Sequence, residues 1–146
     1  MRRKYIDFNC IVLISVTLLY TFNNSFVKPS AHGLLGRLFN NYFNDIICPW
    51  ALLSLTNLFF IFYIPLCKGI IKFKIPFLDV IKYGIYQLKT ILIYCFICAV
   101  YWEFIYPLNH IESTSDIYDL ACYMVGGVLF HLIYRLFKNY NTYSDL

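Results

Sequence analysis

Four long apolar runs, separated by polar connections, dominate the pattern of hydrophobic and polar positions along the chain. The runs extend over about residues 5–22, 45–66, 88–106 and 117–137. Each holds about 20 residues, the length that an α-helix needs to cross the hydrocarbon core of a bilayer. The pattern predicts an all-α fold, a polytopic membrane bundle of four transmembrane helices, with residues 1–146 forming a single domain.

Polar residues and prolines mark the expected ends of these spans. Residues 44–45, Asn-Asp, predict the start of the second helix, and Pro65 predicts its end. Pro107 is expected to end the third helix, and Ser115 or Asp116 to cap the fourth. The spans are thus predicted to begin and end close to the limits of the apolar runs.

The beginning of the chain has the order of a signal peptide, with Arg2-Arg3-Lys4 in front of the first apolar run. No small-x-small cleavage site follows, so we expect the first span to be retained. After it, residues 34–43 alternate loosely between apolar and polar positions at helical spacing. They predict either a short amphipathic helix along the outer membrane surface or an ordinary ordered loop.

Composition agrees with a membrane location. Of the 146 residues, 60 % are hydrophobic and 14 % are charged, whereas soluble domains average about 45–50 % and about 25 %. A soluble domain of this length has too little interior for so many apolar side chains, but a lipid bilayer accepts them at the protein surface. We therefore expect the bilayer as a partner. We expect no nucleic acid, because the basic flanks of the spans account for the net charge of +4.

The six cysteines all lie in or beside apolar runs, where single thiols act as small apolar side chains. Cys95 and Cys98 have the CxxC spacing, but no His or second cysteine pair lies near them in the sequence. We therefore expect neither a disulfide framework nor metal or redox chemistry from these thiols.

Positive charges predict the orientation of the bundle. Lys and Arg number three before the first span, five between the second and third spans, and two at the end of the fourth. Only Lys28 and Arg37 lie on the other side. Because cytoplasmic flanks are enriched in Lys and Arg, we predict that both termini are cytoplasmic.

This topology places five acidic residues at the outer side: Asp45, Glu103, Glu112, Asp116 and Asp119. A charge inside the hydrocarbon costs about 2.5 kcal/mol or more and usually faces a partner or a wet cavity. Glu103 and Asp119 lie within their spans, so they predict ligand binding or proton handling, with a structural hydrogen bond as the alternative. Asp45 and Asp116 are further candidates, with helix capping as the alternative. Glu112 is expected to be a solvated loop charge.

Four residues of the fourth helix share one face because of their i, i+3, i+7, i+10 spacing: Asp116, Asp119, Tyr123 and Gly126. The pair Gly126–Gly127 offers a flat surface for close helix packing, so this face is expected to point into the bundle. Such packing brings the aspartates toward Glu103 and Asp45. The candidate counter-groups are Arg37 and His110.

Residues 100–130 resemble the VanZ-like family of small bacterial membrane proteins. The matching features are Glu103 near the end of the third span, the segment Ser113–Asp119 at the start of the fourth, and Gly126–Gly127. Tyr123 stands where family members commonly have Asn. The resemblance implies the plasma (inner) membrane of a bacterium as the location and a role in the cell envelope.

Two hypotheses about function follow from the location and the acids. The first is a non-enzymatic envelope protein whose outer polar site binds a lipid-linked or cell-wall component, with no cofactor. The second is a cation- or proton-coupled transporter of a small solute, of the magnesium–citrate type, acting as a homo-oligomer; clustered carboxylates suit Mg²⁺. An enzyme is less expected, because the sequence contains no Ser nucleophile with a base, His-rich metal set or Gly-rich phosphate loop.

Overall fold

The computed structural model describes residues 2–30, 32–33, 36, 38–70, 84–109 and 116–143, and all regular structure in these residues is helical. Four helices in this part of the chain are long and apolar enough to cross a membrane: Arg3–Ser30, Leu38–Tyr63, Leu88–Ile105 and Ile117–Tyr140. The predicted all-α class is confirmed for the described residues, and so is the number of helices that could span a membrane. The length and composition of these helices indicate a multi-pass membrane protein.

Three of the long helices join α-helical and π-helical segments without a break. The first consists of α1 (Arg2–Phe22), η1 (Asn23–Val27) and α2 (Lys28–Ser30). The second begins with η2 (Leu38–Tyr42) and continues as α4 (Phe43–Ile70). The third consists of α6 (Leu88–Val100), η3 (Tyr101–Ile105) and α7 (Tyr106–Asn109), and the fourth is α8 (Ile117–Tyr143).

Two of the π-helical turns precede a proline. A proline offers no N–H to the carbonyl four residues before it, and η1 and η3 each end two residues before one, Pro29 and Pro107. At η3, Tyr106 N–H donates to Tyr101 O, five residues back instead of four. The wider turn keeps the chain helical where a proline would otherwise break it, and it places Glu103 in a π-helical segment.

Several predicted helix ends are wrong. The first helix continues past residue 22 as η1 and α2 to Ser30, and α8 continues past residue 137 to Tyr143. α4 passes through Pro65 to Ile70, and the third helix continues past Pro107 as α7. Helical structure also begins at Leu38, within the segment expected as an interfacial helix or loop, so residues 44–45 lie inside the helix and do not cap it. Membrane bundles tolerate prolines inside helices because neighbouring helices and local π adjustments satisfy the freed backbone groups.

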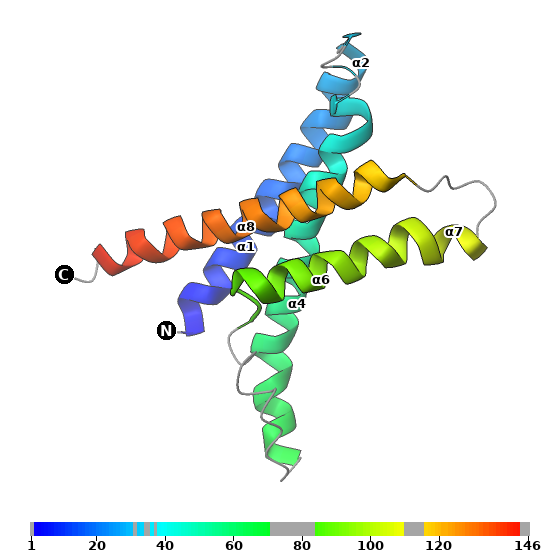
Figure 1. The fold of residues 1–146 in the computed structure, drawn as a ribbon. Coiled ribbons are helices and arrows are strands. Elements are labelled where there is room, and N and C mark those ends of the chain that lie inside the picture. Colours follow the sequence, from blue (N-terminus) through cyan, green and yellow to red (C-terminus); the bar gives the residue numbers. More distant parts are fainter. Residues whose placement is uncertain are drawn as a thin grey trace.

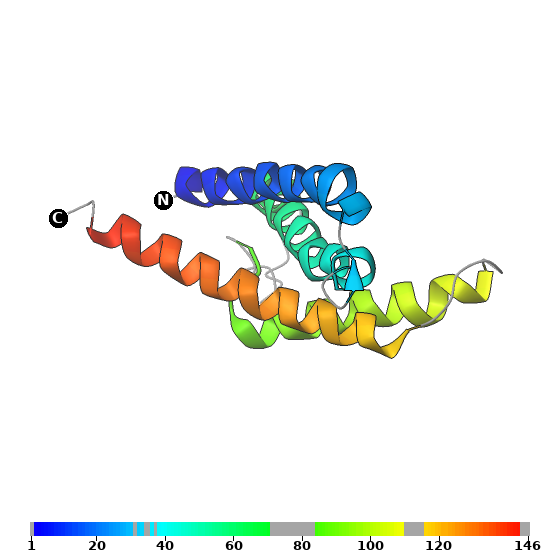
Figure 2. The same cartoon turned by 90° about the horizontal axis from the view of Figure 1, so that it is seen from above.

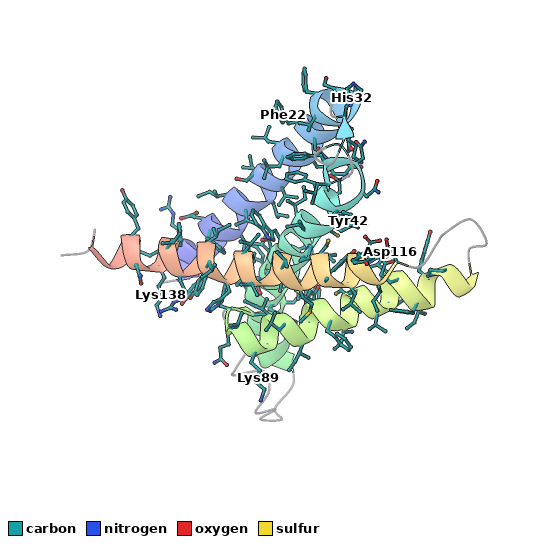
Figure 3. The ribbon with its side chains drawn as sticks, turned by 45° about the horizontal axis from the view of Figure 1, so that its top comes forward. Phe22, His32, Tyr42, Lys89, Asp116 and Lys138 are labelled. Atoms are coloured by element: carbon teal, nitrogen blue, oxygen red, sulfur yellow. The ribbon has the colours of Figure 1, made fainter. Side chains whose placement is uncertain are left out.

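The long helices pack in the order α1, α4, α8, α6, each against the next. Figure 2 shows α4 between α1 and α8, and Figure 1 shows the pair α1–α4 crossing the pair α6–α8. The first and last described residues lie at one end of the molecule (Figure 1), as does Lys138 (Figure 3), and we call this end the terminal end. Tyr86 belongs to the same end, because its ring stacks on Tyr134 in the second half of α8. We call the opposite end, which holds Asp45, Glu103 and Asp119, the acidic end.

Aromatic side chains fill the core at the terminal end. Phe8, which is 2 % exposed, contacts the rings of Tyr86, Phe130, Tyr134 and Phe137 at centroid distances between 5.0 and 6.1 Å. Pairs of this kind add about 0.5–1.5 kcal/mol each beyond the apolar area that they bury. They connect α1 directly to α8 and to the residues that precede α6.

The two neighbouring glycines of α8 lie in two different helix contacts. A Cβ at Gly126 would overlap the carbonyl oxygen of Ile46 in α4, and a Cβ at Gly127 would lie 2.7 Å from Cys95 Sγ in α6. Trp50 Nε1 also donates a hydrogen bond of 2.8 Å to Gly126 O. α8 therefore approaches both neighbours where its side chains are smallest, a packing mode common among membrane helices.

Large apolar side chains are exposed on all four long helices, for example Ile14, Phe59, Ile97 and Leu136. In water such a surface would favour aggregation. In a bilayer it contacts lipid tails, which are as apolar as the side chains themselves. The surface of the molecule thus agrees with the spans that its helix lengths allow.

Candidate functional site

Three carboxylates from three different helices meet at the acidic end. Asp45 lies in the first turn of α4, Glu103 in η3 and Asp119 in the first turn of α8. Asp45 interacts electrostatically with Glu103, and Asp119 interacts with both. All three side chains are partly buried. These are three of the four acids that the sequence predicted to meet, and we call them the carboxylate cluster.

The three residues of the carboxylate cluster have charges of the same sign that act on one another. Lys28, at the end of the first long helix, interacts with Asp45. The predicted counter-groups, Arg37 and His110, lie outside the described residues, and the sequence analysis did not predict Lys28 in this role. Like charges in a partly buried site repel each other more than they would in water, so a bound proton or amine would stabilise the cluster.

Asp116, in contrast, has the geometry of a helix cap. Its Oδ1 accepts a hydrogen bond of 2.9 Å from Tyr118 N–H, at the second residue of α8. Its own N–H donates to Glu103 Oε2 at 3.3 Å. Both carboxylates therefore also satisfy backbone N–H groups at the start of α8, where the helix dipole favours negative charge. Of the two interpretations of Asp116, the structure supports capping.

The face of α8 that begins with Asp116 points into the bundle. Tyr123 is 5 % exposed, and its hydroxyl donates to Cys48 Sγ in α4 at 3.6 Å. On the other side of the helix start, the ring of Tyr42 contacts the ring of Tyr118 at a centroid distance of 6.3 Å. Figure 3 shows Tyr42 and Asp116 at the same end of the molecule. Both η2 and α4 thus contact α8 at the acidic end through tyrosine side chains.

A cavity of about 360 Å³ opens between the first two long helices beside Asp45. Its lining comes from Val16, Thr17 and Tyr20 of α1 and from Asn44, Asp45, Ile47, Cys48 and Ala51 of α4. Asp45 supplies the only carboxylate among these residues, and most of the others are apolar. The cavity can therefore accept an apolar group with a positive or hydrogen-donating end near Asp45.

Asparagines join the first two long helices next to this cavity, a feature that the sequence analysis did not identify. Asn23 Nδ2 donates to Asn44 Oδ1 and to Phe39 O, both at 3.1 Å. Asn44 Nδ2 donates to Asn24 Oδ1 at 3.4 Å. Asn23 is 1 % exposed, and its Oδ1 has no hydrogen-bond partner among the described residues. The signal in the sequence was the Asn pair that directly follows the first apolar run.

A second polar network lies at the terminal end. The sequence predicted that Asn57 joins helices, which is confirmed, but it did not predict the partners of Asn57. Asn9 and Asn57 are both 0 % exposed. Asn9 Nδ2 donates to the Tyr86 hydroxyl at 2.6 Å and accepts at its Oδ1 from Asn57 Nδ2 at 3.4 Å. Asn57 Oδ1 accepts from Ile85 N–H. Burial raises the pKa of the Tyr86 phenol, so the network stays uncharged.

Gly84 makes room for this network. It has a φ of +108°, a conformation that residues with a Cβ rarely adopt. A Cβ at this position would also lie 2.6 Å from Asn57 Oδ1. The residues before α6 can therefore cross close over α4 and align Ile85 N–H with Asn57.

The cysteines and the possible metal ligands are the other candidates for chemistry in the sequence. Cys95 is buried against α8, and the described cysteines are all free thiols. Among the residues that the structure describes, no three His, Cys, Asp or Glu side chains lie close enough together to hold a metal ion. The Mg²⁺ of the transport hypothesis therefore finds no such set of three protein ligands there.

The fold and the site define a class: an all-helical multi-pass membrane protein with carboxylates gathered at one end of the bundle. Comparison with known proteins finds no matching family model, no matching curated protein and no matching solved structure. The resemblance to the VanZ-like family therefore stays a prediction that rests on residues 100–130.

Proposed function

We propose that the chain is a small integral protein of a bacterial plasma membrane, of VanZ-like type, with both termini in the cytoplasm. The excess of Lys and Arg beside the termini supports this orientation. The acidic end then faces outward, toward the cell envelope. There the protein binds an amine-bearing lipid-linked or cell-wall component without converting it chemically.

One observation carries this proposal: Asp45 both lines the apolar cavity and interacts with Glu103 and Asp119. Negative charge beside an apolar cavity favours an amphiphile with a positive end and disfavours a phosphate. An ammonium group of the ligand would pair with Asp45. In the structure, Lys28 is a cation that interacts electrostatically with Asp45. Its apolar part would contact Val16, Ile47 and the other apolar walls.

A binding measurement with a simple probe tests the proposal. Dodecylamine has the required ammonium and chain, and dodecyl phosphate is its anionic counterpart. We expect dodecylamine to raise the thermal unfolding temperature of the detergent-solubilised protein and dodecyl phosphate to have no such effect. Asp45→Asn should abolish the shift, whereas Asp7→Asn, which removes an exposed carboxylate of α1 near the N-terminus, should retain it. An equal response of both variants would exclude Asp45 as the site.

Transport by a proton- or cation-coupled mechanism is the second candidate, favoured by the mutual interaction of the three carboxylates. Carboxylates that interact this way exchange protons or cations readily. Flux in proteoliposomes under a pH or Mg²⁺ gradient separates the candidates. Gradient-driven flux that Glu103→Gln and Asp119→Asn abolish would establish transport, and its absence together with dodecylamine binding would support the binding protein.

The orientation has its own test. Ser30 and Asn139 are exposed residues near opposite ends of the bundle. In a background without native cysteines, Ser30→Cys should react with an impermeant thiol reagent in intact cells, and Asn139→Cys only after lysis. The reverse pattern would place the acidic end in the cytoplasm.

A further inference from the structure

A second cavity, of about 450 Å³, lies at the terminal end, far along α8 from the carboxylate cluster. It opens between the second half of α8 and the residues that precede α6. Figure 3 shows Lys138, which lines it, and Asp116 near opposite ends of α8. The proposed function does not use this cavity.

The lining of this cavity is basic and rich in hydrogen-bond donors. Arg135 and Lys138 supply positive charge, Gln87 and Asn139 supply amides, and none of the described residues that line the cavity is a carboxylate. A guanidinium and an ammonium next to amide N–H groups form the donor set that binds phosphate oxygens through charge-assisted hydrogen bonds.

The walls of the cavity are held in place. His131 Nδ1 lies 2.9 Å from Tyr86 O. Because a carbonyl oxygen only accepts, this nitrogen carries the proton and donates it, which fixes the ring. The Tyr86 and Tyr134 rings, which also line the cavity, stack at 4.2 Å. A cavity with fixed walls needs little reorganisation to bind a ligand.

The depth of the cavity in a bilayer follows from helix length. α8 begins at Ile117, and at about 1.5 Å per residue Arg135 and Lys138 lie about 27 and about 32 Å along its axis. The hydrocarbon core is about 30 Å thick. When the capped start of α8 lies at one membrane surface, Arg135 and Lys138 lie at the depth of the lipid phosphate groups at the opposite surface.

We propose that this cavity binds the phosphate group of an anionic membrane lipid. Arg135 and Lys138 contact the phosphate oxygens, Gln87 and Asn139 contact the rest of the headgroup, and the acyl chains leave along the exposed apolar side of α8, where Leu132 and Leu136 lie. Basic cavities between membrane helices bind lipid headgroups in this way. Free phosphate shares the headgroup chemistry, so the test must separate the two sources.

Native mass spectrometry of the detergent-solubilised protein provides the test. The probes are phosphatidylglycerol, diacylglycerol with the same acyl chains, and inorganic phosphate. We expect tight binding of phosphatidylglycerol only. If diacylglycerol binds as tightly as phosphatidylglycerol, the proposal is wrong. If inorganic phosphate binds more tightly than phosphatidylglycerol, the proposal is also wrong, because the cavity then binds the free ion.

Variants separate the cavity from diffuse attraction by a basic membrane flank. Arg135→Gln with Lys138→Gln should weaken phosphatidylglycerol binding about tenfold or more, since the loss of even one charge-assisted bond is worth roughly a factor of ten. Arg3→Gln with Lys89→Gln removes the same charge outside the cavity and should change binding less than about twofold. Equal loss in the two double variants would overturn the proposal.

A double variant that keeps both charges distinguishes loss of charge from misfolding. Arg135→Lys with Lys138→Arg keeps both charges, and we expect it to retain most of the binding. If this pair unfolds at the wild-type temperature yet binds as weakly as the double glutamine variant, charge in the cavity does not determine binding and the proposal is wrong.

Discussion

The buried amides at the terminal end and the carboxylates at the acidic end differ in burial and in hydrogen bonding. At the terminal end, Asn9 and Asn57 are fully buried, and each of their side-chain nitrogen and oxygen atoms has a hydrogen-bond partner. At the acidic end, Asp45, Glu103 and Asp119 are only partly buried and interact with one another as like charges.

The difference separates groups that specify the fold from groups that are available for a ligand. A neutral amide that is fully bonded stabilises helix contacts in a membrane, where few other partners exist. Neighbouring carboxylates oppose each other and gain stability only when a cation, amine or proton joins them. The comparison therefore predicts large stability effects at the terminal end and functional effects at the acidic end.

The largest loss of stability is expected for Asn57→Leu. The change leaves Ile85 N–H and Asn9 Oδ1 without partners, and each orphaned group costs about 1–3 kcal/mol. The free energy of unfolding, measured by SDS titration in mixed micelles, should fall by about 3 kcal/mol. Thr17→Val is the control, because the exposed Thr17 hydroxyl bonds to Leu13 O of its own helix and to no other described residue, and it should change stability by less than about 0.5 kcal/mol.

A smaller loss is expected at the glycine contacts between the two ends. Gly126→Ala places a methyl group against the Ile46 carbonyl, a backbone group that cannot turn away, and should cost about 1–3 kcal/mol. Gly127→Ala meets the Cys95 thiol instead, so the added change Cys95→Ala should restore stability there. Failure of this rescue in the same SDS titration would contradict the packing of α8 on α6.

The smallest structural loss is expected at the acidic end, from the cap. Asp116→Ala removes the acceptor for Tyr118 N–H and should cost about 1 kcal/mol. Asp116→Asn keeps an acceptor and should cost only a few tenths. If Asp116→Asn also removes dodecylamine binding, Asp116 belongs to the binding site as well as to the cap.

Local patterns in the sequence identified the spans but not the contacts between them. The apolar runs predicted four helices, and the starts at Leu88 and Ile117 match the structure, because hydrophobic length responds directly to the bilayer. The helix ends predicted from Pro65 and from residues 44–45 were wrong. Local sequence signals for helix ends are less reliable where neighbouring helices satisfy the backbone groups. Asn44 instead bonds to Asn23, 21 residues away in the sequence.

More of the arrangement at the acidic end than at the terminal end could be predicted from the sequence. Carboxylates in apolar runs stand out, and helical spacing places Asp116, Asp119 and Tyr123 on one face. The bond from Asn9 to Tyr86 spans 77 residues, and no periodicity links the two. The cavities depend in the same way on side chains from separate helices, so composition and spacing do not reveal them.

The central claim, that the carboxylate cluster is not needed for the fold, has a direct test. The free energy of unfolding of the triple variant Asp45→Asn, Glu103→Gln, Asp119→Asn is measured by SDS titration beside the wild type. These changes keep the side-chain shapes and hydrogen-bond acceptors and remove the mutual repulsion. We predict a stability equal to the wild type within about 0.5 kcal/mol, or higher. A loss of about 3 kcal/mol, as expected for Asn57→Leu, would show that the cluster holds the bundle together and would contradict the account.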